Sequence, residues 1–187
     1  MATNNMLNVG LLGSTGTGSF VGSNTPSLVT PNIGVATATS INLGVSTLNN
    51  YTELTSWTPT FTFVTVGDLS IAYTTQTGFY TRIGDVVYLY CYIKFTPTYT
   101  TASGQGRIAS LPFAAALTST TYGVAASITN TLAFPASRKA LVSRIPAATA
   151  FITLSAAGSG VSLTNLSNAQ FTSGTLFEIQ QFNIYYV

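Results

Sequence analysis

The chain has 187 residues, of which 46% are apolar and only 5% are charged, whereas about 25% of residues are charged in an average soluble domain. Its net charge is +2, and it has one cysteine and no histidine, which excludes charge-driven disorder, an intrachain disulfide and any site that needs an imidazole or several thiolates. Because a surface with so few charges suits a permanent assembly, we expect a homo-oligomer.

The basic residues do not indicate a nucleic-acid partner. Only Arg138, Lys139 and Arg144 lie near one another in the sequence, whereas a surface that follows phosphates needs a stripe of Lys and Arg. No window of about 20 residues is free of polar groups, and the N-terminus lacks the basic start and apolar core of a signal peptide. We therefore expect neither nucleic-acid binding nor membrane insertion.

Residues 1–52 contain no charged side chain and are rich in Gly, Ser, Thr and Asn. They show neither a helical period nor a long alternating run, and the Thr25-Pro26 and Thr30-Pro31 pairs favour extended or turn conformations. We predict an extended N-terminal arm over residues 1–52, held by short apolar groups. It either binds other chains, as a virion attachment or a trimer shaft, or packs against its own domain. The candidate anchoring residues are Leu11, Leu12, Phe20, Val21, Leu28, Val29 and Ile33.

Residues 53–187 carry strand signals, because β-branched and aromatic residues alternate with polar ones between Gly, Pro and Asn. Residues 76–78 and 84–85 are predicted turns, residues 96–106 a polar loop, and only residues 114–117 favour a helix, weakly. The number and spacing of the strands predict an all-β antiparallel sandwich, a jelly roll. The predicted strands are residues 57–66, 70–75, 79–83, 86–95, 107–110, 122–129, 131–134, 138–145, 150–154 and 176–187.

The predicted strand 86–95 has two different faces. The face predicted to point into the core carries Val87, Leu89, Cys91, Ile93 and Phe95. The other face carries a tyrosine row, Tyr88, Tyr90 and Tyr92. Because tyrosine favours half-wet places, this row is a candidate protomer interface, a ligand platform, or simply the outer face of a sheet.

Four motifs in the sequence carry a resemblance to a known family. They are GSTGTGSFVGSNTPSLVTPNIG at 13–34, WTPT at 57–60, YTRIGDVVY at 80–88 and LPF at 111–113. The first resembles the "GTGxFVxSxxPxLVTPxxG" segment of tailed-phage virion proteins. The other three resemble, in order and spacing, the C-terminal domain of phage tail-fibre and virion-fibre proteins. The resemblance implies a trimeric β-sandwich tip on a phage particle, although it transfers no receptor-binding residue.

The acidic residues give little support for catalysis. Asp68 and Asp85 each follow a glycine in a predicted turn, Glu53 lies at the start of the domain, and Glu178 lies in the final strand. Glycoside hydrolysis needs two carboxyl groups about 5 to 9.5 Å apart, which this distribution does not predict. The glycines at 13–18 have no following lysine or helix, so they do not form a phosphate loop. We expect no catalytic residue, no metal and no cofactor.

Two non-enzymatic hypotheses follow from these features. In the first, the protein is a trimeric virion fibre or knob whose arm binds a tail adaptor or the capsid, and whose tip binds a host-surface glycan through aromatics such as Tyr99 and Tyr122. In the second, it is a capsid decoration or cement protein whose uncharged arm clamps neighbouring major capsid subunits. Because only an arm precedes the domain, a short knob is favoured over a long fibre. Both hypotheses place the protein on the virion surface.

Overall fold

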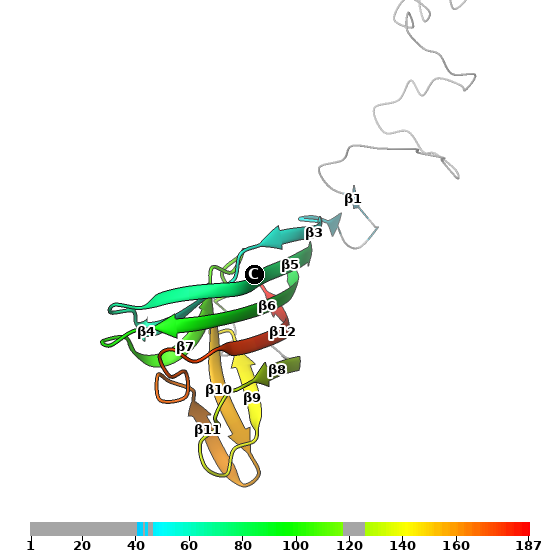
Figure 1. Ribbon diagram of the computed structural model, residues 1–187. Helices are drawn as coiled ribbons and strands as arrows, with labels where there is room; N and C mark the ends of the chain where they lie inside the picture. Colours follow the sequence, from blue (N-terminus) through cyan, green and yellow to red (C-terminus); the bar gives the residue numbers. More distant parts are fainter. Residues whose placement is uncertain (1–40, 43, 45–46, 118–125) are drawn as a thin grey trace, which may run out of the picture. The chain divides into compact units, whose positions relative to one another are not determined.

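The computed structural model describes residues 41–42, 44, 47–117 and 126–187, which belong to the unit Ala38–Val187. The seven candidate anchoring residues of the arm lie outside these ranges, as does Tyr122. Within them the chain forms twelve strands (Figure 1). The strands are β1 (Ile41–Asn42), β2 (Thr47–Leu48), β3 (Thr52–Trp57), β4 (Thr60–Thr65), β5 (Ser70–Ile83), β6 (Val86–Thr98), β7 (Ser103–Ala109), β8 (Ala126–Asn130), β9 (Ala140–Arg144), β10 (Ile152–Gly158), β11 (Val161–Asn165) and β12 (Phe177–Tyr186).

Two five-stranded antiparallel sheets form the domain, and β1 and β2 make a separate short hairpin. The first, which we call the tyrosine sheet, has the order β3-β5-β6-β12-β8. The second, which we call the arginine sheet, contains β4, β7, β9, β10 and β11. Strands β9, β10 and β11 run across the direction of β5, β6 and β12 (Figure 1). The prediction of an all-β antiparallel sandwich is confirmed.

Strand β10 organises the arginine sheet. One of its edges pairs with β9 from Thr153 to Ala157. Its other edge pairs first with β7, at Ile152 and Thr153, and then with β11 from Ser155 onward. Strand β4 completes the sheet on the far side of β7. This arrangement places side chains from β7, β9, β10 and β11 on one outer surface.

The core lies between the two sheets and is rich in aromatic rings. Phe61 of β4 stacks on Phe95 of β6 at 4.4 Å between ring centroids, and Phe171 packs against Phe61 and Phe177. The inward face predicted for residues 86–95 is confirmed, since all five of its side chains are fully buried. Among the described residues no helix is long and apolar enough to cross a membrane.

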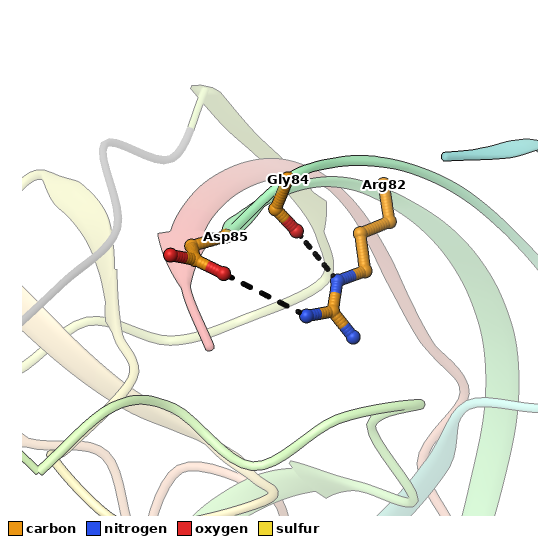
Figure 2. A network of polar contacts seen from close by, with 3 residues as sticks. All are labelled: Arg82, Gly84 and Asp85. Atoms are coloured by element: carbon orange, nitrogen blue, oxygen red, sulfur yellow. Dashed lines mark hydrogen bonds and ion pairs between the residues drawn. The ribbon is translucent and has the colours of Figure 1, made fainter. Parts of the chain in front are cut away.

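The predicted hairpin at Gly84-Asp85 is confirmed, because Ile83 pairs with Val86 across a two-residue turn. Gly84 has a φ of 60°, which fits a type II′ turn with glycine at its first central position. Figure 2 shows the Arg82 guanidinium beside this turn, where its Nε donates a 2.7 Å hydrogen bond to Gly84 O and its Nη2 lies 3.9 Å from Asp85 Oδ1. The Arg82 guanidinium also lies 4.9 Å from the centre of the Phe113 ring.

Several predicted boundaries are wrong. The predicted strand 57–66 is two strands, since Pro59 interrupts the pairing and the chain crosses from the tyrosine sheet to the arginine sheet. The predicted turn 76–78 is the middle of β5, where Gly78 makes room for the indole of Trp57. The predicted loop 96–106 is shorter, because β6 continues to Thr98 and β7 begins at Ser103.

Other expectations fail in the second half of the chain. No helix forms at residues 114–117, and residues 131–134 are not a strand. Strand β11 was not predicted, because it has only five residues and four of them are exposed, so its sequence shows only a short and weakly apolar pattern. Strand β10 extends beyond residue 154 to Gly158, since β9 and β11 both pair with its second half.

Candidate functional site

The outer face of the tyrosine sheet is the first candidate surface. Strand β6 is the middle strand of this sheet, and Tyr88, Tyr90 and Tyr92 alternate with its buried residues. The tyrosine row therefore runs along the centre of the outer face, with β5 on one side and β12 on the other. The predicted outward placement of the row is confirmed, while its role as a protomer interface stays a prediction.

One half of this face is apolar. Tyr90 lies between Phe79 and Phe182 in register, and its ring stacks on Phe79 at 6.5 Å. Tyr88 lies between Thr81 and Ile184, and the next row ends in Ile83 and Tyr186. Because contiguous exposed apolar side chains often bind partners, this half of the face is a candidate interaction surface. We call it the apolar patch; its members Phe79, Ile83, Tyr88, Phe182, Ile184 and Tyr186 are each between 36% and 51% exposed.

The other half of the face is polar and already hydrogen-bonded. Tyr92 Oη donates to Glu178 Oε1 at 2.8 Å, and Gln180 Nε2 donates to Tyr90 Oη at 3.1 Å. The hydrogen bond to Glu178 raises the pKa of Tyr92. Lys94 pairs in register with Glu178 across β6 and β12. The tyrosine row thus begins in an apolar environment and ends in a polar one.

Tyr99 occupies a structural position near the end of β6. Its Oη donates to the carbonyl oxygens of Asn168 and Phe171 at 2.9 and 2.7 Å, and its ring lies edge-on to Phe63 at 5.2 Å. Burial raises the pKa of Tyr99. Its hydroxyl is therefore engaged in holding the loop before β12, and its contact with a receptor stays a prediction.

The β4–β5 loop is fastened to the β6–β7 loop by one carboxylate. Asp68 accepts hydrogen bonds from the backbone N–H and hydroxyl of Thr100, from both groups of Thr101, and from Ala102 N–H. The Thr100 hydroxyl and the amides of Thr101 and Thr100 hold the pKa of Asp68 well below its usual range. This role accounts for Asp68 in structural terms and goes beyond the local turn that the sequence predicts.

The remaining carboxylates are dispersed. Glu53 lies in β3, Asp85 in the β5–β6 turn and Glu178 in β12. Among the described residues no three His, Cys, Asp or Glu side chains gather as a metal site would require. Cys91 is fully buried in the centre of β6, and this burial raises the pKa of its thiol to about 12.

A groove on the outer face of the arginine sheet is the second candidate surface, and the sequence did not predict it. It has a volume of about 470 Å³, within the range of small-molecule sites. We call it the arginine groove; its lining residues are Gln105, Arg107, Arg144, Pro146, Phe151, Thr153 and Asn165.

The two arginines meet through the strand order of the sheet. Arg107 of β7 and Arg144 of β9 both pair in register with Thr153 of β10, from opposite edges. Cross-strand partners share one face, so both side chains emerge on the same side, with their Cα atoms roughly 10 Å apart at two strand spacings. The Arg107 guanidinium lies 4.1 Å from the centre of the Phe151 ring. Neither Nε has a hydrogen-bond partner among the described residues.

Gln105 and Asn165 form the polar wall of the groove. Gln105 Nε2 donates to Leu154 O at 3.0 Å, to Ser155 Oγ at 3.3 Å and to Asn165 Oδ1 at 3.0 Å. These bonds lie where β7 stops pairing with β10 and β11 begins. In the bond between the two amides Gln105 is the donor and Asn165 the acceptor, so Gln105 Oε1 and Asn165 Nδ2 take no part in it. The wall therefore offers both an acceptor and a donor.

Comparison with known proteins identifies the fold. No family model and no curated protein sequence matches the chain. Among solved structures, the Dettilon tailspike protein (gp208) is similar over 72% of this chain, with a TM-score of 0.55 and 14% sequence identity. The matched region is 24% of the tailspike chain. At this identity the likeness is one of fold, and it agrees with the two-sheet architecture described above.

Proposed function

We propose that this protein is a non-enzymatic structural component of a bacteriophage virion. The observation that carries the proposal is the fold that it shares with part of a phage tailspike. The motifs at 57–60, 80–88 and 111–113 also support this assignment, because they resemble the C-terminal domain of phage tail-fibre and virion-fibre proteins. In this proposal residues 1–52 attach the protein to the particle, and residues 53–187 form a jelly-roll knob that contacts the host surface.

The knob acts as a homotrimer in this proposal, and the apolar patch is its contact surface. Phe79, Tyr88 and Phe182 are large, exposed and adjacent, whereas few charged side chains are available to keep copies apart. Aromatic residues are enriched at protein interfaces because they bury a large area with little loss of side-chain entropy. A trimer presents three copies of every receptor site, which raises the effective affinity of weak contacts.

The arrangement of the acids supports a role without catalysis. Asp68 is bonded into a loop contact, Asp85 lies beside Arg82, and Glu178 accepts a hydrogen bond from Tyr92. Each of these carboxylates has a structural partner, and the three lie in different elements. Attachment and assembly need only shape and surface chemistry, which the two outer faces supply.

Locating the protein on purified particles tests the proposal. We expect immunogold labelling and quantitative mass spectrometry to find the protein on the virion, with few copies at the tail. Hundreds of copies on the shell would instead support the second hypothesis, in which the uncharged residues 1–52 clamp major capsid subunits. Absence of the protein from particles that are otherwise complete would contradict both.

A further inference from the structure

The arginine groove combines positive charge with hydrogen-bonding groups suited to a polyol. Arg107 and Arg144 contribute two guanidinium groups, and among the described residues no acidic side chain lines the groove. Two unneutralised guanidinium groups on one surface favour an anion, which they bind through charge-assisted hydrogen bonds. The amide wall of Gln105 and Asn165 adds an acceptor and a donor of the kind that bind hydroxyl groups.

The groove is also shaped before any ligand arrives. Phe151 lies under the Arg107 guanidinium and restricts its orientation, and Thr153 Oγ1 donates to the backbone oxygen of Arg144 at 2.9 Å. All the lining residues except Pro146 and Phe151 lie on paired strands. Groups held by a rigid sheet lose little entropy on binding. Even a small ligand that makes few contacts can therefore bind here.

A carboxylate from a second copy of the chain is a weaker candidate for this groove. The chain has only four acidic residues. Asp68, Asp85 and Glu178 already have partners within their own copy. A nucleic acid is also a poor fit, because two arginines do not form the basic stripe that follows a phosphate backbone.

We propose that the arginine groove binds an acidic sugar residue of a polysaccharide, with Arg107 and Arg144 holding its anionic group and Gln105 and Asn165 its hydroxyl groups. The proposal rests on the proposed function, since a host-surface polysaccharide is the source of such a sugar for a virion knob. The anionic group is a carboxylate or a phosphate, and both fit the guanidinium geometry.

Calorimetric titration of the intact protein with glucuronate, glucose 6-phosphate, glucose and inorganic phosphate tests the proposal. We expect at least one of the two anionic sugars to bind about tenfold more tightly than glucose, and the better of them identifies the anion. We also expect it to bind more tightly than inorganic phosphate, because the amide wall contacts the hydroxyl groups. Equal affinity for glucose and the anionic sugars, or no binding of any probe, would overturn the proposal.

Matched variants locate the binding. Arg144→Gln should weaken binding of the anionic sugar about tenfold, whereas Lys139→Gln removes the same charge outside the groove and should leave it unchanged. Asn165→Ala, which keeps both arginines, should weaken sugar binding while leaving phosphate binding intact. Equal effects of Arg144→Gln and Lys139→Gln on sugar binding would contradict the proposal. It would also be contradicted if Arg144→Gln changed the oligomeric state of the protein but left sugar binding unchanged.

The failure of this proposal is distinguishable from failure of the proposed function. If particles carry the protein but it binds no acidic sugar, only the proposal that the arginine groove binds sugar is rejected. Sugar binding by a protein that is absent from particles would reject the virion assignment alone.

Discussion

The indole of Trp57 lies across Gly78 and donates a 3.1 Å hydrogen bond to the carbonyl oxygen of Tyr90, two strands away in the tyrosine sheet. Trp57 pairs in register with Gly78 of β5, so only a residue without a side chain leaves space for the ring. This contact joins β3, β5 and β6 on their inner side.

The substitution Gly78→Ala should therefore destabilise the domain. A Cβ at this position would lie 2.5 Å from Trp57 Nε1, and the indole would have to leave its hydrogen bond. We expect the free energy of unfolding to fall by about 1–3 kcal/mol, as for other overpacked cores. Urea unfolding followed by the fluorescence of Trp57, the single tryptophan, measures this change.

A double-mutant cycle assigns the effect to this contact. In a Trp57→Leu background, followed by circular dichroism, Gly78→Ala should cost less because the indole is gone. An unchanged cost would mean that the alanine meets some other group.

Acid should loosen the loop contact made by Asp68. A carboxylate whose pKa is lowered on folding adds stability above its ordinary pKa of 3.8, and this stability is lost as the pH falls below that value. We expect Asp68→Asn to lower Tm by a few degrees at neutral pH and to reduce the loss of Tm on acidification. Thermal unfolding measured across this pH range tests both expectations.

Asp85→Asn is the matched control for Asp68→Asn. The Asp85 side chain is 76% exposed and its ion pair with Arg82 spans 3.9 Å, so it contributes little. If the two variants behaved alike, the loop contact of Asp68 would not be the cause.

Cys91 should be inert in the folded protein. Its thiol is fully buried in the middle strand of the sheet, and its pKa of about 12 leaves almost no thiolate near neutral pH. We expect an aromatic disulfide reagent to label Cys91 only when the domain unfolds, at a rate that rises with urea in step with global unfolding. Rapid labelling in the absence of denaturant would show that β6 opens locally.

A charge in the apolar patch should prevent assembly. Phe182→Glu places a carboxylate at the centre of the proposed contact, where docking would bury it without a partner. In size-exclusion chromatography with light scattering, we expect the variant to elute as a monomer and the unmodified protein to elute as a trimer. Leu163→Glu on β11 is the control, because Leu163 has a similar exposure, 44% against 42%, on the other sheet. A trimeric Phe182→Glu variant would exclude this surface.

Removing residues 182–187 should give insoluble protein. The deletion shortens β12 and takes away Tyr185, which is fully buried and donates a hydrogen bond to Phe113 O. It also uncovers the edge of β6 beside the tyrosine row. Soluble, folded trimer from this truncation would contradict the expectation.

The sequence predicts those parts of the fold in which local pattern and tertiary environment agree. Strand β6 alternates over its full length because one face is core and the other is surface, and the Gly84-Asp85 turn has the residues that its backbone needs. The middle of β5 was misread because Gln76, Thr77 and Gly78 resemble a turn. They lie in a strand because they pair with Ile93, Tyr92 and Cys91 of β6. The glycine leaves room for Trp57, a contact that no local pattern reveals.

The two candidate surfaces also have some features that the sequence predicts and others that it does not. Alternation alone predicts that Tyr88, Tyr90 and Tyr92 point outward, but not which of them has apolar neighbours, since those come from β5 and β12. Arg107 and Arg144 are far apart in the sequence and become neighbours only because both pair with Thr153. The sequence carries no signal for that pairing, so the arginine groove emerges only from the strand order.

The place of β12 between β6 and β8 has a consequence for synthesis on the ribosome. While β7 to β11 are being translated, the edge of β6 that will pair with β12 has no partner. Strand β8 also lacks its only neighbour among the described strands of the tyrosine sheet, which is β12. An unpaired edge next to exposed aromatic rings invites association between nascent chains. The arginine sheet lacks this delay, since all its strands precede β12. We therefore expect the growing chain to complete the arginine sheet first. We also expect it to depend on a chaperone until β12 completes the tyrosine sheet.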